Sequence, residues 1–125
     1  MIHLDTSFLI RALLSDTAED TALRRWVRDG EDVGISAVAW SEFLCGPLPA
    51  ELRELAEQIL DEPAPLGISE AVRAALLFND SGRRRGSLVD CFIAATALEA
   101  GALLATSNRA DFRKLEPLGL KLAAT

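Results

Sequence analysis

The chain has 125 residues, half of them apolar, which favours a single domain over residues 1–125 with a substantial core. Its formal net charge of −6 counts against a large non-specific nucleic-acid surface, because such surfaces are usually basic. No apolar stretch has membrane-spanning length and no cleavable signal is evident, so no membrane association is expected. Two cysteines make no disulfide framework, and we expect a reducing cytoplasm as the compartment.

Apolar runs and helical patterns alternate along the chain. The periodicity predicts strands over residues 1–5, 33–35 and 102–106, and further short strands within 63–68 and 118–123. It predicts helices over residues 6–14, 17–29, 37–45, 50–60, from 69 through 76, and over 87–100 and 109–115. Residues 79–86 are polar and basic and are expected to form a loop or a frayed helix end. Alternating strands and helices indicate an α/β fold whose parallel sheet has helices on both faces.

Asp5 ends the first apolar run, and a helix pattern begins at once. This junction fits a buried strand that leads directly into a helix, so Asp5 would lie at the sheet edge where open α/β folds bind their ligands. Asp5 or Thr6 would also make an ordinary N-cap for the first helix, and this stretch alone favours that reading.

Glu42 lies in a segment, residues 37–45, that is apolar on nearly every face. Such a helix should be buried, and a buried carboxylate needs a cation as its partner. The partner would be an arginine or a metal ion, unless the helix exposes one narrow strip.

Asp90 and Asp111 each begin a predicted helix, and each has a structural explanation. Ser87 and Asp90 resemble a capping box, while Asn108 would cap the next helix and Asp111 would favour its first turn. In a parallel sheet, however, these positions share one edge with Asp5. Four carboxylates gathered there, Asp5, Glu42, Asp90 and Asp111, would repel one another unless a cation lay among them. Hard oxygen ligands select Mg²⁺ or Mn²⁺.

Four short motifs, in this order and spacing, resemble those of PIN-domain ribonucleases of the VapC toxin type. They are residues 1–7, 41–46, 90–97 and 106–112. The resemblance covers nearly the whole chain and implies a three-layer α/β/α sandwich with a central parallel sheet. It also implies a Mg²⁺- or Mn²⁺-dependent endoribonuclease, a cognate antitoxin that blocks the site, and a homodimer.

The same resemblance assigns roles to the acids. Asp5 and Asp90 match the main metal ligands, and Glu42 and Asp111 complete the cluster by binding a second metal or ordering water. Metal-activated water would then attack the RNA phosphodiester. Thr6 and Asn108 match positions that support such a site by hydrogen bonds.

Other readings stay open at this point. The run Arg83, Arg84 and Arg85 would bind RNA phosphates or simply form a solvated loop. A Mg²⁺-binding phospho-acceptor domain needs an acid pair after its first strand, whereas Asp5 stands alone there. A catalytically silent binding module is the remaining class, against which the four intact acids argue. His3 has the pattern of a structural histidine within the first strand.

Overall fold

The structure, a computed structural model, describes all of residues 1–125 and is built on a parallel sheet. Its three strands have the order β2 (Val33–Ile35), β1 (Ile2–Leu4), β3 (Leu103–Ala105). Leu4 of the central strand is aligned with Ile35 on one side and Ala105 on the other. The carboxyl ends of all three strands therefore meet at one edge of the sheet.

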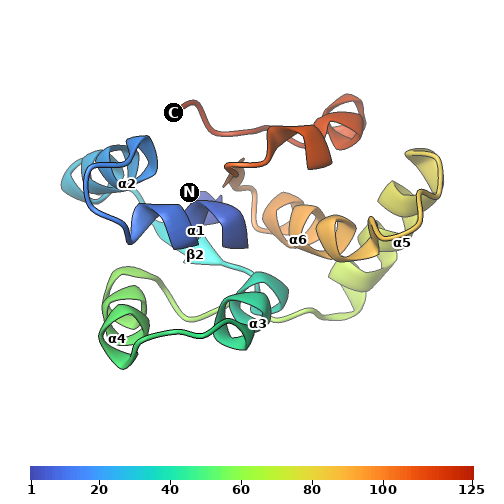
Figure 1. Cartoon of the computed structure of the whole chain (residues 1–125). Coiled ribbons are helices and arrows are strands. Elements are labelled where there is room, and N and C mark those ends of the chain that lie inside the picture. The colour runs from blue at the N-terminus through green and yellow to red at the C-terminus, as the bar shows by residue number, and fades with distance from the viewer.

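Helices cover both faces of this sheet, which makes the fold a three-layer α/β/α sandwich, as the sequence predicted. They are α1 (Thr6–Ala12), α2 (Ala18–Arg28), α3 (Ala37–Cys45), α4 (Ala50–Ile59), α5 (Ile68–Asp80) and α6 (Leu88–Glu99). Two 3-10 segments, η1 (Arg109–Asp111) and η2 (Arg113–Leu118), follow β3. In Figure 1, α2 and α4 lie at one end of the molecule and α5 lies at the other.

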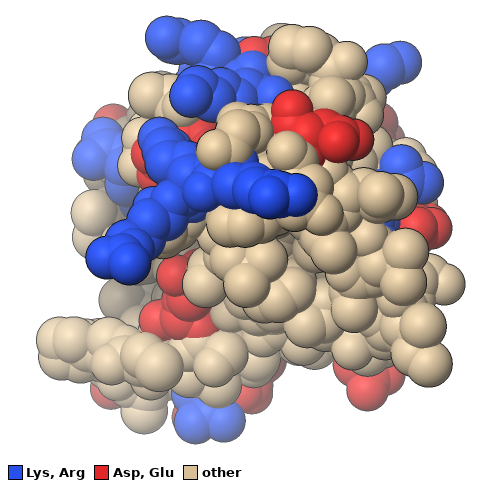
Figure 2. Space-filling model, turned by 90° about the vertical axis from the view of Figure 1, so that its right-hand side faces the viewer, with Lys and Arg blue, Asp and Glu red and all other residues tan.

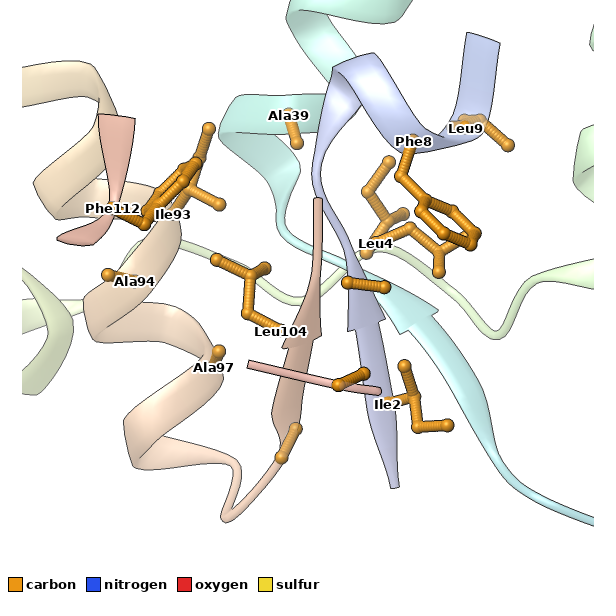
Figure 3. Close-up of a cluster of buried hydrophobic side chains, with 14 of the residues drawn as sticks. Ile2, Leu4, Phe8, Leu9, Ala39, Ile93, Ala94, Ala97, Leu104 and Phe112 are labelled. Atoms are coloured by element: carbon orange, nitrogen blue, oxygen red, sulfur yellow. The ribbon is translucent and has the colours of Figure 1, made fainter. Parts of the chain in front are cut away.

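Both faces of the sheet bury apolar side chains. Figure 3 shows Leu104 of β3 directed toward Ala94 and Ala97 of α6, whereas Leu4 lies beside Phe8 of α1. These five residues belong to one cluster of 27 buried apolar residues. Alanine on the inner face of α6 lets that helix lie close to the sheet, so the first turn of α6 is held near the strand ends.

The strand predicted within residues 63–68 is reduced to one residue. Ala64 donates its backbone N–H to Ile35 (2.8 Å) and accepts from Ala37 (2.7 Å), which pairs it with the end of β2. Pro63 and Pro65 flank it and have no N–H to continue the ladder. The pairing therefore stops at Ala64, and α5 begins at Ile68.

Other element boundaries also differ from the prediction. The final strand within 118–123 is a single bridge between Leu122 and Leu104, and residues 109–115 form two 3-10 segments that meet at Phe112. Asn79 and Asp80 complete α5 rather than opening the loop. Both cysteines are free thiols, of which Cys91 is buried and Cys45 is exposed. None of the helices combines the length and apolar composition that crossing a bilayer requires.

His3 lies at the centre of β1 and is almost fully buried, which fits a structural role. Its ring lies over Gly34, the residue opposite it on β2. Burial lowers the pKa of His3 first, the N-terminal ammonium lowers it further, and Asp61 opposes both. The ring is therefore favoured in its neutral form within the sheet.

A methyl group at Gly34 should test this packing. In Gly34→Ala the new Cβ would lie 3.3 Å from His3 Cδ2 and 3.4 Å from Nε2. The buried ring has little room to move, so we expect a loss of about 1–3 kcal/mol in the free energy of unfolding by urea. Gly46→Ala, whose Cβ meets nothing closer than 3.9 Å, is the control. Equal effects of the two substitutions would contradict the contact.

Candidate active site

The residues that follow the three strands form the floor of the candidate site. Asp5 follows β1, Ser36 follows β2 and Thr106 follows β3, so parallel register sets Asp5 between the other two. Ser36 accepts a hydrogen bond from the N–H of Ala39 (3.0 Å) and caps α3. The start of α3, which carries Glu42, is thereby fixed beside Asp5.

The Asp5 carboxylate is held by hydroxyls and does not cap the helix. Asp5 occupies the N-cap position of α1 but makes no side-chain capping bond. Instead, Ser7 (2.7 Å) and Thr106 (2.9 Å) both donate to its Oδ2. Although Asp5 is only 6% exposed, its Oδ1 accepts no hydrogen bond and is not sealed from solvent. Capping is therefore the wrong explanation of Asp5, and one oxygen stays free for a ligand.

Glu42 reaches the same edge from α3, but the reasoning from burial was wrong. Only Ala39 and Phe43 of α3 are buried, and Glu42 is exposed because this helix packs on the molecule through a narrow strip. The Thr6 hydroxyl lies 2.9 Å from Glu42 Oε1 and 3.1 Å from the carbonyl of Ala39, and can donate to either. Thr6 thus links the beginning of α1 to the acid on α3.

Asp90 lies in the first turn of α6 and is half-buried. The capping-box explanation fails here as well, since the Ser87 hydroxyl donates to the carbonyl of Arg84 (2.7 Å) and makes no capping bond. Burial raises the pKa of Asp90 to about 6, with repulsion from Asp111, Asp5 and Glu42 adding to it and Arg84 opposing it. The other three predicted acids therefore each lie within electrostatic range of Asp90.

Asp111 comes from η1 and is bound by Asn108. The Asn108 amide donates to Asp111 Oδ2 (2.5 Å), and its own backbone N–H donates to the Thr106 hydroxyl (3.0 Å). Asn108 does not cap η1 through its side chain. A chain of bonds thus runs from Asp5 through Thr106 and Asn108 to Asp111.

Ser7 and Thr106 are the site residues that sequence reasoning missed. Ser107 and Glu19 extend their network: Ser107 donates its N–H to Ser7 (3.2 Å) and its hydroxyl to Glu19 (2.6 Å). That hydrogen bond is the main cause of the lowered pKa of Glu19, to which Arg11 adds. Thr106 could have been found from the sequence, because it is the last residue of a predicted strand and so lies at the same edge of the sheet as Asp5.

The charge at this edge is not neutralised by the protein. None of the four acids takes part in an ion pair with Lys or Arg. As they lie, no three His, Cys, Asp or Glu side chains are close enough to hold one metal ion. The donor set is nevertheless of the kind that Mg²⁺ or Mn²⁺ binds, namely carboxylate oxygens with an accessible Oδ1 on Asp5. A divalent cation would also relieve the repulsion that adds to burial in raising the pKa of Asp90.

Comparison with known proteins identifies the family. The sequence model of the PIN domain matches residues 2–116, which is most of the chain. The chain belongs to the PIN domain family. None of the curated protein sequences compared with it matches.

Solved structures share this PIN fold. VapBC2 from Rickettsia felis, bound to a DNA fragment from their promoter, is 18% identical, with 98% of each chain covered and a TM-score of 0.76. FitAcB from Neisseria gonorrhoeae is 21% identical, with 99% of this chain and 97% of that chain covered and a TM-score of 0.73. A toxin-antitoxin complex from Klebsiella pneumoniae is 23% identical, with 90% of each chain covered and a TM-score of 0.73.

The raised pKa of Asp90 predicts a pH-dependent cost to the metal-free PIN domain. Between pH 3.8 and about 6 the folded protein holds a proton that the unfolded chain releases, so this group's contribution to stability falls as pH rises. Asp90→Asn removes that cost. We therefore expect the variant to gain stability relative to the wild type from pH 4 to pH 7, measured by urea unfolding with a chelator. Asp32→Asn, at an exposed acid outside the cluster, is the charge-matched control. A stability difference for Asp90→Asn that does not change with pH would contradict the repulsion.

Proposed function

We propose that this PIN domain is a metal-dependent endoribonuclease and the toxin of a toxin–antitoxin pair. The convergence of four unneutralised carboxylates at the sheet edge is the observation that carries the proposal. Family membership supports a nuclease over a phospho-acceptor domain or a silent binding module. The buried residues Leu120 and Ala123 lie beyond the matched range yet within the same core cluster, which supports one domain over residues 1–125.

The hydrogen bonds of the site suggest a separate role for each residue. Asp5 and Asp90 would hold Mg²⁺ or Mn²⁺, and Glu42 and Asp111 would complete the ligand set or order water. A bound divalent ion supplies activated water and stabilises charge on the phosphate. Ser7 and Thr106 orient the Asp5 carboxylate, Thr6 orients Glu42, and Asn108 orients Asp111. Each acid other than Asp90 thus has a hydroxyl or amide that fixes its direction.

Loss of the charge on Asp5 should separate chemistry from folding. Asn keeps the shape of Asp5 and can still accept hydrogen bonds from Ser7 and Thr106, but it cannot act as an anionic ligand. We expect Asp5→Asn to abolish Mg²⁺-dependent cleavage of RNA while the unfolding transition stays within about 1 kcal/mol of the wild type. Asp29→Asn, at an exposed acid outside the cluster, should cut at the wild-type rate. Equal cleavage by Asp5→Asn and wild type would refute the mechanism.

We also propose that an antitoxin covers a groove between α1, α2 and α4. The groove has a volume of about 520 Å³, and its apolar lining includes Leu13, Leu23, Val27, Leu55 and Ile59. A strip of this kind suits the apolar face of a helix from a partner protein. The similar structure from Klebsiella pneumoniae is described as a toxin-antitoxin complex, which supports such a partner here.

The homodimer is proposed from the outer face of α5. Ile68, Val72 and Leu76 recur every four residues along this helix and are 85%, 56% and 57% exposed, while Ala74 and Leu77 face the core. An apolar stripe opposite the buried side of a helix is costly in water and suits a second protein surface. A second copy of this chain would cover it.

A charge placed within that stripe should disrupt the dimer. We expect Val72→Glu to convert the protein from dimer to monomer in sedimentation-velocity runs, because a carboxylate would be buried without a partner. Val27→Glu is the matched control, since Val27 has nearly the same exposure (51%) but lies on α2 in the proposed antitoxin groove. A dimer that survives Val72→Glu would contradict the assignment of α5.

A further inference from the structure

The cations of this acidic protein fall into two groups. Five of the thirteen Lys and Arg residues form ion pairs with carboxylates: Arg11, Arg24, Arg28, Arg53 and Arg73. None of the cations in residues 83–85 or 113–114 does so. Figure 2 shows Lys and Arg side chains crowded over one part of the face that carries α5, with Asp and Glu side chains beside them. These cations are therefore left for an anion from outside the chain.

Two of the unpaired cations lie at the candidate active site itself. Arg84 and Lys114 line a narrow hollow together with Asp90 and Asp111. Arg83 and Arg85, the neighbours of Arg84 in the run, do not line it. The charge of Arg84 also lowers the pKa of Asp90, against the effect of the other acids. Cations and metal-binding candidates thus share one wall of the site without pairing with each other.

The backbone around Arg84 is fixed to the start of α6. Its carbonyl accepts hydrogen bonds from both the N–H (3.1 Å) and the hydroxyl (2.7 Å) of Ser87. Gly82 and Gly86 take positive φ angles of 103° and 85°, which turn the chain tightly on either side. Ser87 is the N-cap residue of α6 and precedes Asp90 by one turn. These bonds therefore fix the backbone of Arg84 relative to the backbone of Asp90.

Lys114 is fixed by buried neighbours on η2. Phe112 and Leu115 are almost fully buried, and the N–H of Leu115 donates to the carbonyl of Phe112 (3.0 Å). The exposed Lys114 lies between these two anchors in the chain, so its backbone position is set by the core. The two cations therefore approach the hollow from independent, well-held segments.

We propose that Arg84 and Lys114 form a subsite for the RNA phosphate that neighbours the scissile one, on the Asp90 and Asp111 side of the site. This inference rests on the proposed nuclease function. A strand that crosses four carboxylates is repelled by them, and a net charge of −6 offers no general attraction. Two local cations compensate one phosphate group and give the strand a defined register. RNA binding was one of two readings of the arginine run, and of its three members only Arg84 takes part in this proposed subsite.

RNA binding should be measured with a variant that does not cleave RNA. The background is Asp5→Asn, and the probe is a fluorescein-labelled single-stranded RNA of twelve mixed-sequence nucleotides, followed by anisotropy. We expect Arg84→Gln with Lys114→Gln to weaken binding by about tenfold and to reduce the salt slope by roughly 0.7, the value for one phosphate of a single strand. Arg83→Gln with Arg85→Gln removes the same charge from the same face. It is the matched control and should weaken binding by less than threefold, about the effect of one weak surface charge pair.

Replacing single phosphates tests the position of the subsite. A series of RNAs each carries one neutral methylphosphonate next to a cleavage site mapped with the wild-type protein. We expect one flanking position at which this change weakens binding to the Asp5→Asn protein about tenfold but leaves unchanged the binding to Asp5→Asn that also carries Arg84→Gln and Lys114→Gln. In cleavage assays with the intact Asp5, the same double variant should act mainly by raising KM, because a contact with a flanking phosphate is made in the ground state as well as in the transition state.

The outcomes separate this proposal from the function on which it depends. If the wild type cuts no RNA with Mg²⁺, the proposed function fails, whatever the binding results. If cleavage occurs but the control pair matters as much as Arg84 and Lys114, or no methylphosphonate position is coupled to them, the subsite is overturned. A diffuse field over the whole basic face would then explain the binding.

Discussion

Mutual repulsion among Asp5, Glu42, Asp90 and Asp111 is the constraint around which this PIN domain is organised. The four acids come from distant parts of the chain, and each is attached to a backbone segment that the core holds in place. The repulsion therefore cannot relax fully by moving the side chains apart. Burial is the larger cause of the raised pKa of Asp90, and the repulsion adds to it, so this carboxyl group keeps its proton to a higher pH than usual. Cation binding and proton binding are alternative ways to relieve the same strain.

The hydroxyl groups around the acids hold two of the carboxylates in fixed directions. Two hydroxyls bind the same oxygen of Asp5, and a third lies against Glu42. A hydroxyl stabilises an anion without neutralising it, so orientation is achieved while the negative charge is retained. Lysine or arginine in these positions would have satisfied the acids and left nothing for a metal. Ser and Thr beside these acids thus leave the negative charge of the cluster intact.

The sequence predicted the layers and the site's location because both follow from short-range pattern. Apolar runs followed at once by helix patterns indicate parallel strands, and parallel strands place Asp5 and Thr106 at the same edge. The prediction failed where the outcome depends on packing between segments. The apolar composition of α3 does not reveal that one strip alone is covered, so Glu42 was expected to be buried and is exposed. Nor does local sequence show that Ser87 bonds back to Arg84 in place of capping α6.

The edges of the sheet also restrict how other proteins can attach. On the β2 side, Ala64 occupies the edge and is flanked by two prolines that cannot donate to a further strand. On the β3 side, Leu122 makes the corresponding bridge to Leu104. A peptide in extended conformation therefore has no free ladder to join, and β-augmentation and edge-to-edge aggregation are both disfavoured. Recognition of this fold is left to its helical surfaces, where a mutation can weaken one contact without opening the sheet.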